Sequence, residues 1–509
     1  MAKGDLNSQN SFTKSKVIGL GIGLFLFVIF VLNLPGFDMP YPACATAGVV
    51  LMMAAFWISQ CLPIPVTSLL PIVLFPILGI AGSQETVKYY ADNNIYLFMG
   101  GFIIALAIEK WNLHRRIALL ITLLLGTSPA KIILGFMGGT AFMSMWISNT
   151  ATALIMLPIG MAVISELESD RDKLANFGVS LMLGIAYGAS LGGIATPIGT
   201  PPNILFLGVY EKGFAAAPTI SFFNWFIVFL PLVLVLLPLT WLIMTKLVFP
   251  TSNALGSGRE IIKAELKKLG PMSAPERKVL IIFIITGLLW IFRSDINLGF
   301  ASLPGWSNIL SNPKLIHDST VAIFMGIILF IIPAGKNHRG QFLMDWRTAV
   351  KLPWGILLLF GGGFAIAGGF VASGLDSQIG LALKPYLIFH PLLIVGLICL
   401  LITFLTELTS NTATAATFLP ITMGAAVALK INPLLLMLPV TISASMAFML
   451  PVATPPNAIV FSSGRIKISQ MVRVGVILNI VIALIVACYI YFFVLPIWGY
   501  SPEIPSWAG

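Results

Sequence analysis

The chain has 509 residues, of which 58% are hydrophobic and only 9% are charged. Soluble domains carry about 25% charged residues, so this composition excludes a soluble enzyme and indicates an all-α protein that crosses a membrane many times. The net charge of +10 would suggest nucleic-acid binding in a soluble protein. Here the basic residues stand in short loops between apolar runs, where they set topology, so we expect the lipid bilayer rather than a nucleic acid as partner.

Apolar runs follow one another along nearly the whole chain. A polar cytoplasmic tail (1–16) precedes a run over 17–34 that is longer than the core of a signal peptide, so we expect it to be retained as the first span. The segment 251–278 is the least apolar internal one and predicts a cytoplasmic linker between two halves, and 498–509 is expected as an external tail. The predicted spans and broken apolar stretches are 17–34, 43–60, 64–82, 93–109, 117–164, 179–209, 222–249, 279–292, 320–333, 353–373, 386–428, 432–462 and 474–497.

The positions of the basic residues predict the orientation. If the N-terminus is cytoplasmic and the stretches 117–164 and 386–428 each return to the side they entered from, most of the 29 Lys and Arg residues fall on the cytoplasmic side. The opposite orientation would invert this bias, which is rare in membrane proteins. The sequence therefore predicts about eleven transmembrane helices plus two re-entrant hairpins, with the N-terminus inside and the C-terminus outside.

Two short polar motifs occur twice. The hexapeptide SNTATA at 148–153 recurs at 410–415, 262 residues later, and the tetrapeptide TPPN at 200–203 recurs at 454–457, 254 residues later. Two motifs in the same order and at similar spacing indicate an internal duplication. An odd number of predicted spans separates the two hairpins, so they enter the membrane from opposite sides, which is the inverted-repeat plan of secondary transporters.

These motifs combine helix breaks with neutral polar side chains. A broken helix is tolerated within a membrane only where protein or a polar cavity covers it, and Pro455 and Pro456 leave carbonyls free around Ala453. Such carbonyls, together with Ser, Thr and Asn oxygens, form a neutral cage suited to sodium, while the hairpin tips present helix N-termini that attract anions. Isolated Ser and Thr residues in membrane helices more often bond their own backbone, but two paired copies favour a binding site.

The remaining polar residues give weaker signals. Glu407 lies three residues before Ser410, and its counterpart in the first repeat is Met145. An intramembrane carboxyl group is a functional hypothesis by default; we favour a neutral or hydrogen-bonded group that orients the hairpin, with proton coupling as the alternative. The four Cys and four His residues are scattered and no HExxH motif is present, so we expect no cofactor and no enzyme activity.

The run EKWNLHRRIAL at 109–119, the paired SNTATA motifs and the GTPPN/ATPPN pair resemble the divalent anion–sodium symporter family. Members of this family carry dicarboxylates, citrate and, in some branches, sulfate, and the resemblance spans about residues 45–495. It implies a homodimer with an elevator mechanism, in which a scaffold holds the dimer and a transport domain moves. The scaffold would comprise 17–114 and 279–375, and the transport domain 115–250 and 376–497.

The resemblance also implies the site and its function. It assigns one sodium site to Ser144, Ser148, Asn149 and Gly199, and a second to Thr406, Thr409, Asn411 and Ala453. The substrate carboxylates would meet Asn149, Thr150, Ser410, Asn411, Thr412, Thr454 and Pro455. We therefore expect sodium-coupled uptake of C4-dicarboxylates such as succinate, malate or fumarate across the cell membrane. A sodium-independent dicarboxylate exchanger, or a citrate or sulfate carrier on the same fold, is the alternative; no Lys or Arg stands at these positions in place of a cation, which favours symport.

Overall fold

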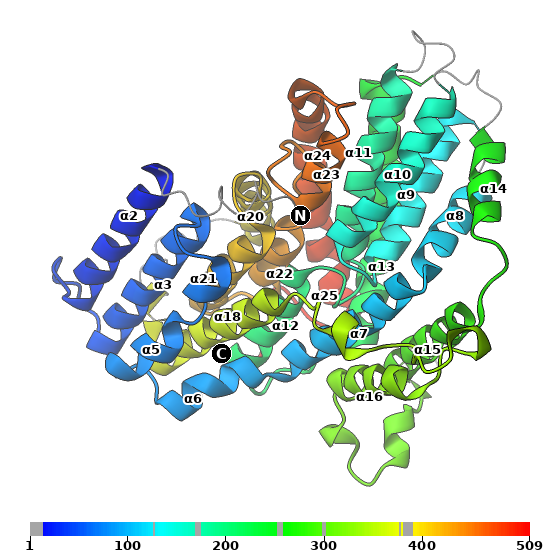
Figure 1. Ribbon diagram of the computed structural model, residues 1–509. Coiled ribbons are helices and arrows are strands. Elements are labelled where there is room, and N and C mark those ends of the chain that lie inside the picture. Colours follow the sequence, from blue (N-terminus) through cyan, green and yellow to red (C-terminus); the bar gives the residue numbers. More distant parts are fainter. Residues whose placement is uncertain are drawn as a thin grey trace.

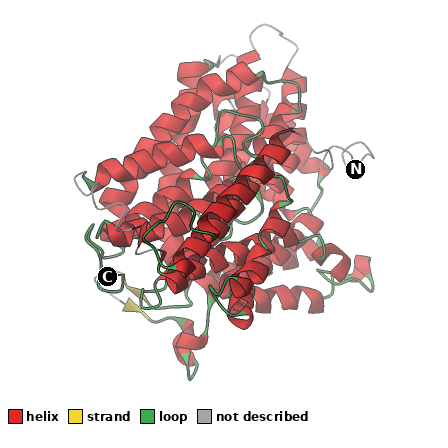
Figure 2. Cartoon of the chain, turned by 90° about the vertical axis from the view of Figure 1, so that its left-hand side faces the viewer, coloured by secondary structure: helices red, strands yellow, loops and turns green. Residues whose placement is uncertain are grey.

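The computed structural model of the protein describes residues 14–125, 128–167, 175–251, 258–297, 302–375, 378–379 and 390–508. Helices dominate this part of the chain, as Figures 1 and 2 show, and one small antiparallel hairpin pairs Ile296 with Leu303. The expected tail 1–16 lies almost wholly outside the described residues, as do parts of the expected linker 251–278 and the first residues of the stretch 386–428.

The first half of the chain contains the elements up to the linker. They are α2 (Lys14–Val31), α3 (Tyr41–Ser59), α4 (Ile64–Thr67), α5 (Leu70–Ile77), α6 (Ser83–Lys88), the 3-10 turn η1 (Tyr89–Ala91), α7 (Asn93–Lys110), α8 (Leu113–Leu125), α9 (Pro129–Ser144), α10 (Asn149–Leu167), α11 (Ala175–Gly193), α12 (Pro201–Gly213), α13 (Phe222–Leu242), the π-helical segment η2 (Ile243–Val248) and α14 (Gly258–Lys268).

The second half contains a short β-hairpin after its first helix. Its elements are α15 (Ala274–Ile291), β1 (Ile296–Asn297), β2 (Ser302–Leu303), the 3-10 turns η3 (Trp306–Ile309) and η4 (Pro313–Leu315), α16 (Asp318–Ile331), η5 (Lys336–His338), α17 (Trp346–Ala349), α18 (Trp354–Ser373), α20 (Pro391–Thr406), α21 (Asn411–Ala428), α22 (Leu434–Ser443), α23 (Pro455–Phe461), α24 (Ile468–Tyr489), η7 (Ile490–Val494) and α25 (Leu495–Ile497).

The apolar runs coincide with helices, although not all are long enough to span a bilayer alone. Within the described residues, the helical segments with the length and composition of a span are Tyr41–Ser59, Ser83–Lys110, Phe222–Val248, Trp354–Ser373 and Ile468–Ile497. The expected span 64–82 is instead two short helices, α4 and α5. Pro71 lies in the first turn of α5, where proline is tolerated, but it has no N–H to donate to the Thr67 carbonyl and so cannot continue α4. Helix α15 begins inside the expected linker, since Ser273 and Glu276 cap its first turn.

Close helix contacts surround the centre of the molecule. A Cβ added to Gly100 of α7 would lie 2.5 Å from the Ala322 carbonyl carbon of α16, and one added to Gly362 of α18 would lie 2.6 Å from the Ser68 carbonyl oxygen. Glycine is required at these positions because the backbones touch. Helix α18 also packs against α12 and α21, and α7 packs against α12; α12 and α21 each carry one of the repeated motifs.

The helix breaks occur at the predicted positions in both repeats. Thr200 has φ −145° and ψ 143°, and Thr454 has φ −140° and ψ 150°. A residue before proline is driven out of the helical region, and proline is favoured in the first turn of a new helix. Helix α11 therefore ends before the first TPPN motif and α12 begins within it, while α22 and α23 are separated in the same way.

Candidate functional site

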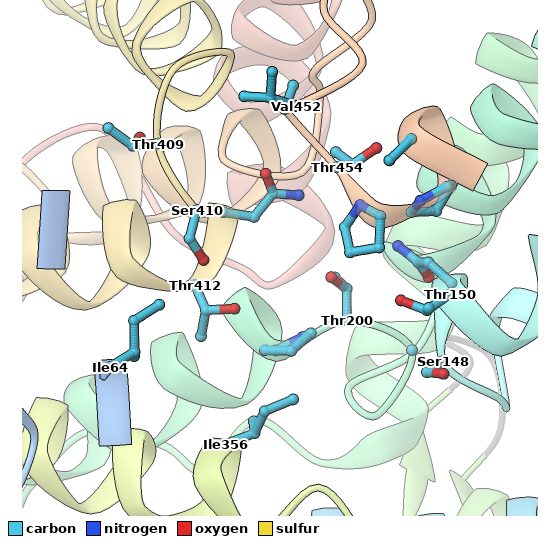
Figure 3. A pocket seen from close by; sticks show the side chains of 18 of the residues that line it. Ile64, Ser148, Thr150, Thr200, Ile356, Thr409, Ser410, Thr412, Val452 and Thr454 are labelled. Carbon is cyan, nitrogen blue, oxygen red and sulfur yellow. The ribbon is translucent and has the colours of Figure 1, made fainter. Parts of the chain in front are cut away.

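The two hairpin turns and the two helix breaks meet at one cavity of about 460 Å³. Figure 3 shows Ser148 and Thr150 on one side of it, Ser410 and Thr412 on the other, and Thr200 and Thr454 between them. The residues that line it are Gln60, Ile64, Phe98, Phe102, Ser148, Asn149, Thr150, Gly199, Thr200, Pro201, Ile356, Leu408, Thr409, Ser410, Asn411, Thr412, Val452, Ala453, Thr454, Pro455, Pro456 and Ala458.

Oxygen atoms of the first repeat converge beside Gly193. The Ser144 hydroxyl donates a hydrogen bond to Asn149 Oδ1 over 2.5 Å. A Cβ added to Gly193 would lie 2.9 Å from Asn149 Oδ1 and 3.3 Å from the Gly199 carbonyl oxygen, so both oxygens face the bare side of this glycine. Ser148 stands at the start of α10, where its Oγ accepts a hydrogen bond from the Ala151 amide. We call Ser144, Ser148, Asn149 and Gly199 the first oxygen cluster.

The second repeat reproduces the contact between the hydroxyl and the asparagine. Thr406 Oγ1 lies 2.8 Å from Asn411 Oδ1 and 2.9 Å from the Ala444 carbonyl oxygen. The Thr409 hydroxyl contacts the Leu405 carbonyl oxygen and the Thr414 hydroxyl. Ala453 lies in the second helix break, at the position equivalent to that of Gly199 in the first. We call Thr406, Thr409, Asn411 and Ala453 the second oxygen cluster.

The last asparagine of each TPPN motif ties its helix break together. Asn203 Nδ2 donates to the carbonyl oxygens of Gly193 and Thr196, at 3.1 and 2.7 Å. The equivalent Asn457 Nδ2 donates to Ala447 and Leu450, at 3.1 and 3.0 Å. Each donor and each acceptor of the second break lies 254 positions after its counterpart in the first, so the two repeats share the same hydrogen bonds. These amides hold otherwise unpaired carbonyls in place.

The Glu407 side chain binds the backbone of the second helix break. Its carboxyl oxygens accept hydrogen bonds from three successive backbone amides, those of Phe448, Met449 and Leu450, at 2.7, 2.8 and 3.0 Å. The Asn479 side-chain amide of α24 donates a fourth at 2.8 Å. Glu407 is buried and does not line the cavity. Glu407 is thus hydrogen-bonded, as we favoured from the sequence, while its role in orienting the hairpin stays a prediction.

The cavity wall is electrically neutral. None of the described residues that line it is charged, yet it contains the first residues of α10, α12, α21 and α23, namely Asn149, Pro201, Asn411 and Pro455. The free N–H groups at helix N-termini give each such end a partial positive charge. Oxygen clusters beside converging helix N-termini are chemically able to hold cations and a small anion next to one another.

The structure brings the predicted site residues together. All of them line the cavity except Ser144 and Thr406, which lie one layer behind and contact Asn149 and Asn411. Sequence reasoning missed Thr200 and Pro201, although their repeat counterparts Thr454 and Pro455 were predicted. It also missed Gln60 and the apolar wall formed by Ile64, Phe98, Phe102 and Ile356, which no motif marks.

A second cavity, of about 290 Å³, adjoins the first and shares Phe102, Ser148, Thr150 and Ile356 with it. It continues along α7 to Glu109 and Lys351. Both of these side chains are exposed, so the two cavities form a path from the paired motifs to one surface of the protein.

One segment matches a catalytic sequence motif but is part of a helix. Residues 188–192 read GASLG, which fits the G-x-S-x-G pattern of a strand-to-helix nucleophile elbow. Ser190 instead lies inside helix α11, is buried, and has no hydrogen-bond partner in the described part of the chain. Nor do the described residues contain a group of three or more His, Cys, Asp or Glu side chains that could hold a metal ion.

Solved structures share this fold at low sequence identity. The YdaH transporter of Alcanivorax borkumensis matches with a TM-score of 0.56 and 12% identity, covering 89% of this chain and 98% of its own. MtrF of Neisseria gonorrhoeae, described as illuminating a class of antimetabolite efflux pumps, matches with a TM-score of 0.56 and 13% identity, covering 94% and 100%. The chain therefore shares the helical fold of these two proteins.

Sequence relatives are much more similar. The sodium-dependent dicarboxylate transporter SdcS of Staphylococcus saprophyticus is 40% identical over 98% of this chain and 95% of its own. SdcS of Staphylococcus aureus is 43% identical over 96% and 93%. A family model described as the sodium:sulfate symporter transmembrane region matches residues 14–498. The chain therefore belongs to the sodium:sulfate symporter family, as the repeated motifs indicated.

Proposed function

We propose that this protein couples sodium entry to the uptake of C4-dicarboxylates such as succinate, malate or fumarate across the cell membrane. The observation that carries the proposal is a neutral cavity flanked by two equivalent oxygen clusters. The SdcS relatives are named for sodium-dependent dicarboxylate transport, and their similarity extends over nearly the whole chain.

In this proposal the clusters bind sodium. Ser144, Ser148, Asn149 and Gly199 form the first site, and Thr406, Thr409, Asn411 and Ala453 form the second. Hydroxyl, amide and carbonyl oxygens are the hard, uncharged ligands that suit a monovalent cation. A bound sodium ion at each site also supplies positive charge that the cavity lining lacks.

The substrate occupies the space between the two sodium ions. Asn149 and Thr150 on one side, and Ser410, Asn411 and Thr412 on the other, face the dianion, with Thr454 and Pro455 closing the second break. A dianion in a neutral pocket is stabilised by the helix N-termini and by the two cations, so sodium and substrate bind as a linked system. A cavity of about 460 Å³ leaves ample room for a four-carbon acid.

The family resemblance and the paired motifs support the finer architecture. We infer about eleven spans, with α9–α10 and α20–α21 as re-entrant hairpins of an inverted repeat, and a cytoplasmic N-terminus. The scaffold (17–114 and 279–375) forms the homodimer, and the transport domain (115–250 and 376–497) moves against it as an elevator. The two are connected by the linker 251–278, while 498–509 is external.

The second cavity, which runs along α7, indicates the side of the membrane from which the binding site is accessible in this conformation. Under this topology Glu109 and Lys351 lie at the cytoplasmic end of the second cavity, so the site is reached from the cytoplasm. At the other end of α7, Asp92 forms an ion pair with Lys212 of α12 at 2.7 Å, and Asn94 donates to Glu211 at 2.7 Å. These contacts join scaffold to transport domain on the external side and must open when the transport domain moves outward.

The test is uptake of radiolabelled succinate into proteoliposomes with an imposed sodium gradient, at fixed pH and voltage. We expect uptake to require sodium and to be competed by malate and fumarate more strongly than by citrate or sulfate. Equal uptake with choline in place of sodium would contradict the coupling, and succinate counterflow without sodium would identify an exchanger. Stronger competition by citrate or sulfate would instead identify a different substrate on the same site.

A further inference from the structure

We propose that Glu407 is a positioning residue that sets the geometry of the second sodium site through the protein backbone, and that the first repeat performs the same attachment with Thr196. This inference rests on the sodium sites of the proposed function. It assigns Glu407 no contact with sodium or substrate and no proton-carrying role.

The contacts of Glu407 join three separate elements. Its side chain leaves the turn between α20 and α21 and reaches the backbone amides of residues 448–450, which lie in the break between α22 and α23. Asn479 of α24 donates to the same carboxyl group. Glu407 Oε1 thus receives three hydrogen bonds and Oε2 receives one, so the donors around it are those that a carboxylate needs in place of water.

The backbone of the break is held from both sides. While the Phe448 amide donates to Glu407, the Phe448 carbonyl oxygen accepts a 2.6 Å hydrogen bond from the Tyr187 hydroxyl of α11. The Asn457 side chain fixes the next carbonyls along, those of Ala447 and Leu450. With residues 447–450 fixed in this way, the direction of the chain that leads to Ala453 is also fixed. Glu407 directly follows Thr406, so one residue connects both halves of the second oxygen cluster.

The first repeat makes the same attachment with different atoms. The counterpart of Glu407 is Met145, and the counterpart of Leu450 is Thr196. The Thr196 hydroxyl donates to the Met145 backbone carbonyl oxygen, so a side chain of the break reaches the hairpin turn instead of the reverse. The carbonyl equivalent to that of Phe448 belongs to Ile194 and is held by the Trp225 indole N–H at 2.9 Å. Chemically different hydrogen bonds thus join the hairpin turn to the helix break at equivalent positions in the two repeats. We infer that both repeats require this connection between turn and break.

This equivalence permits an exchange experiment. The variant Glu407→Met removes the link from the second repeat, and Glu407→Met with Leu450→Thr rebuilds it as the first repeat has it. Thr441→Ala is the control, because the Thr441 hydroxyl is buried in α22 but bonds only to the Met437 carbonyl of its own helix. Sodium half-saturation and succinate affinity at saturating sodium are measured for each protein in proteoliposomes.

We expect Glu407→Met to raise the sodium half-saturation by up to roughly a hundredfold. The free energy of the lost hydrogen bonds to a charged group sets this upper limit, since Glu407 acts on the site only through the backbone. Succinate affinity should recover at saturating sodium, since the cavity wall is unchanged. Adding Leu450→Thr should lower the sodium half-saturation again by about threefold to tenfold, the worth of one neutral hydrogen bond. The Thr441→Ala control should alter thermal stability only.

Two results would overturn the inference. If Glu407→Met keeps the sodium half-saturation of the wild type, Glu407 does not position the site. If the double variant is no better than Glu407→Met, the carboxyl group acts in another way, for instance as a cation ligand or a proton carrier.

Hydrogen exchange at the amides of residues 448–450 tests the link without transport. These amides should exchange slowly in the wild type and faster in Glu407→Met, and equal exchange in the two proteins would contradict the link. Because this measurement needs neither sodium nor succinate, failure of the link is distinguished from failure of the proposed function, which the wild-type sodium dependence alone decides.

Discussion

The Gly193→Ala substitution probes the first sodium site directly. The added Cβ would lie 2.9 Å from Asn149 Oδ1, whereas ordinary contacts of a Cβ begin at 3.4 Å. The amide oxygen would have to retreat by about 0.5 Å, more than the range of roughly 0.3 Å over which hard cations accept oxygen ligands. The Gly199 carbonyl oxygen, at 3.3 Å, would also be crowded.

Losing one oxygen ligand to a charged partner costs about 1.5–3 kcal/mol, which corresponds to a roughly tenfold to hundredfold weaker affinity. We therefore expect Gly193→Ala to raise the sodium half-saturation of succinate uptake by that factor. The apparent succinate affinity should fall with it at low sodium, since the two ligands are linked.

The matched control is the repeat counterpart. Ala447 already carries a Cβ at the equivalent place, so Ala447→Gly removes atoms and creates no clash. We expect its sodium half-saturation to stay within about twofold of the wild type. Sodium-dependent uptake is measured in proteoliposomes after each protein is shown to be monodisperse. A wild-type sodium response in folded Gly193→Ala would refute the placement of sodium beside Asn149 and Gly199.

Three further predictions concern other contacts. Asn149→Ala and Asn411→Ala should each weaken both sodium and succinate binding roughly tenfold to a hundredfold, and near-normal binding isotherms in either variant would reduce the SNT motifs to packing elements. Arg116 of α8 and the buried Glu276 of α15 form a largely buried ion pair at 2.5 Å. Glu276→Gln should lower stability by up to about 3–5 kcal/mol, since it leaves the charge of Arg116 without its partner. Arg116→Met with Glu276→Met should melt closer to the wild type, and the reverse order in a thermal-unfolding series would contradict this. The pKa of Glu211, beyond the predicted span 179–209, is raised to about 7, chiefly by burial and against the hydrogen bond from Asn94. Its proton is therefore bound more tightly in the folded protein than in the unfolded chain, and stability should fall as the pH rises through about 7. The melting temperature of the wild type should drop relative to Glu211→Gln as the pH rises from 4.5 to about 7, the ordinary and the raised pKa of this group. Parallel curves would show that Glu211 is not buried in this way.

Local features of the sequence determined the class of protein and the position of the breaks. Sparse charge and repeated apolar runs predict a helical membrane protein because every backbone polar group must be paired within the bilayer. The TPPN motifs predict the breaks because proline acts on the residue directly before it, and Thr200 and Thr454 have the extended backbone that this requires. The two copies of each motif, with the residues beside them, predicted half of the cavity lining, since duplicated segments repeat their local structure.

Contacts between distant segments were decided only by the tertiary structure. Nothing near Glu407 in the sequence indicates that residues 448–450 and Asn479 would donate to it, because those partners belong to other helices. The apolar wall of Phe98 and Phe102 carries no motif, and its role depends on how α7 packs beside α12. Nothing in the sequence distinguishes Gly193 from other helical glycines. Only the folded structure shows that the Asn149 amide and the Gly199 carbonyl oxygen both lie against it. A motif specifies which groups are present, whereas the packing of the helices specifies which of those groups face one another.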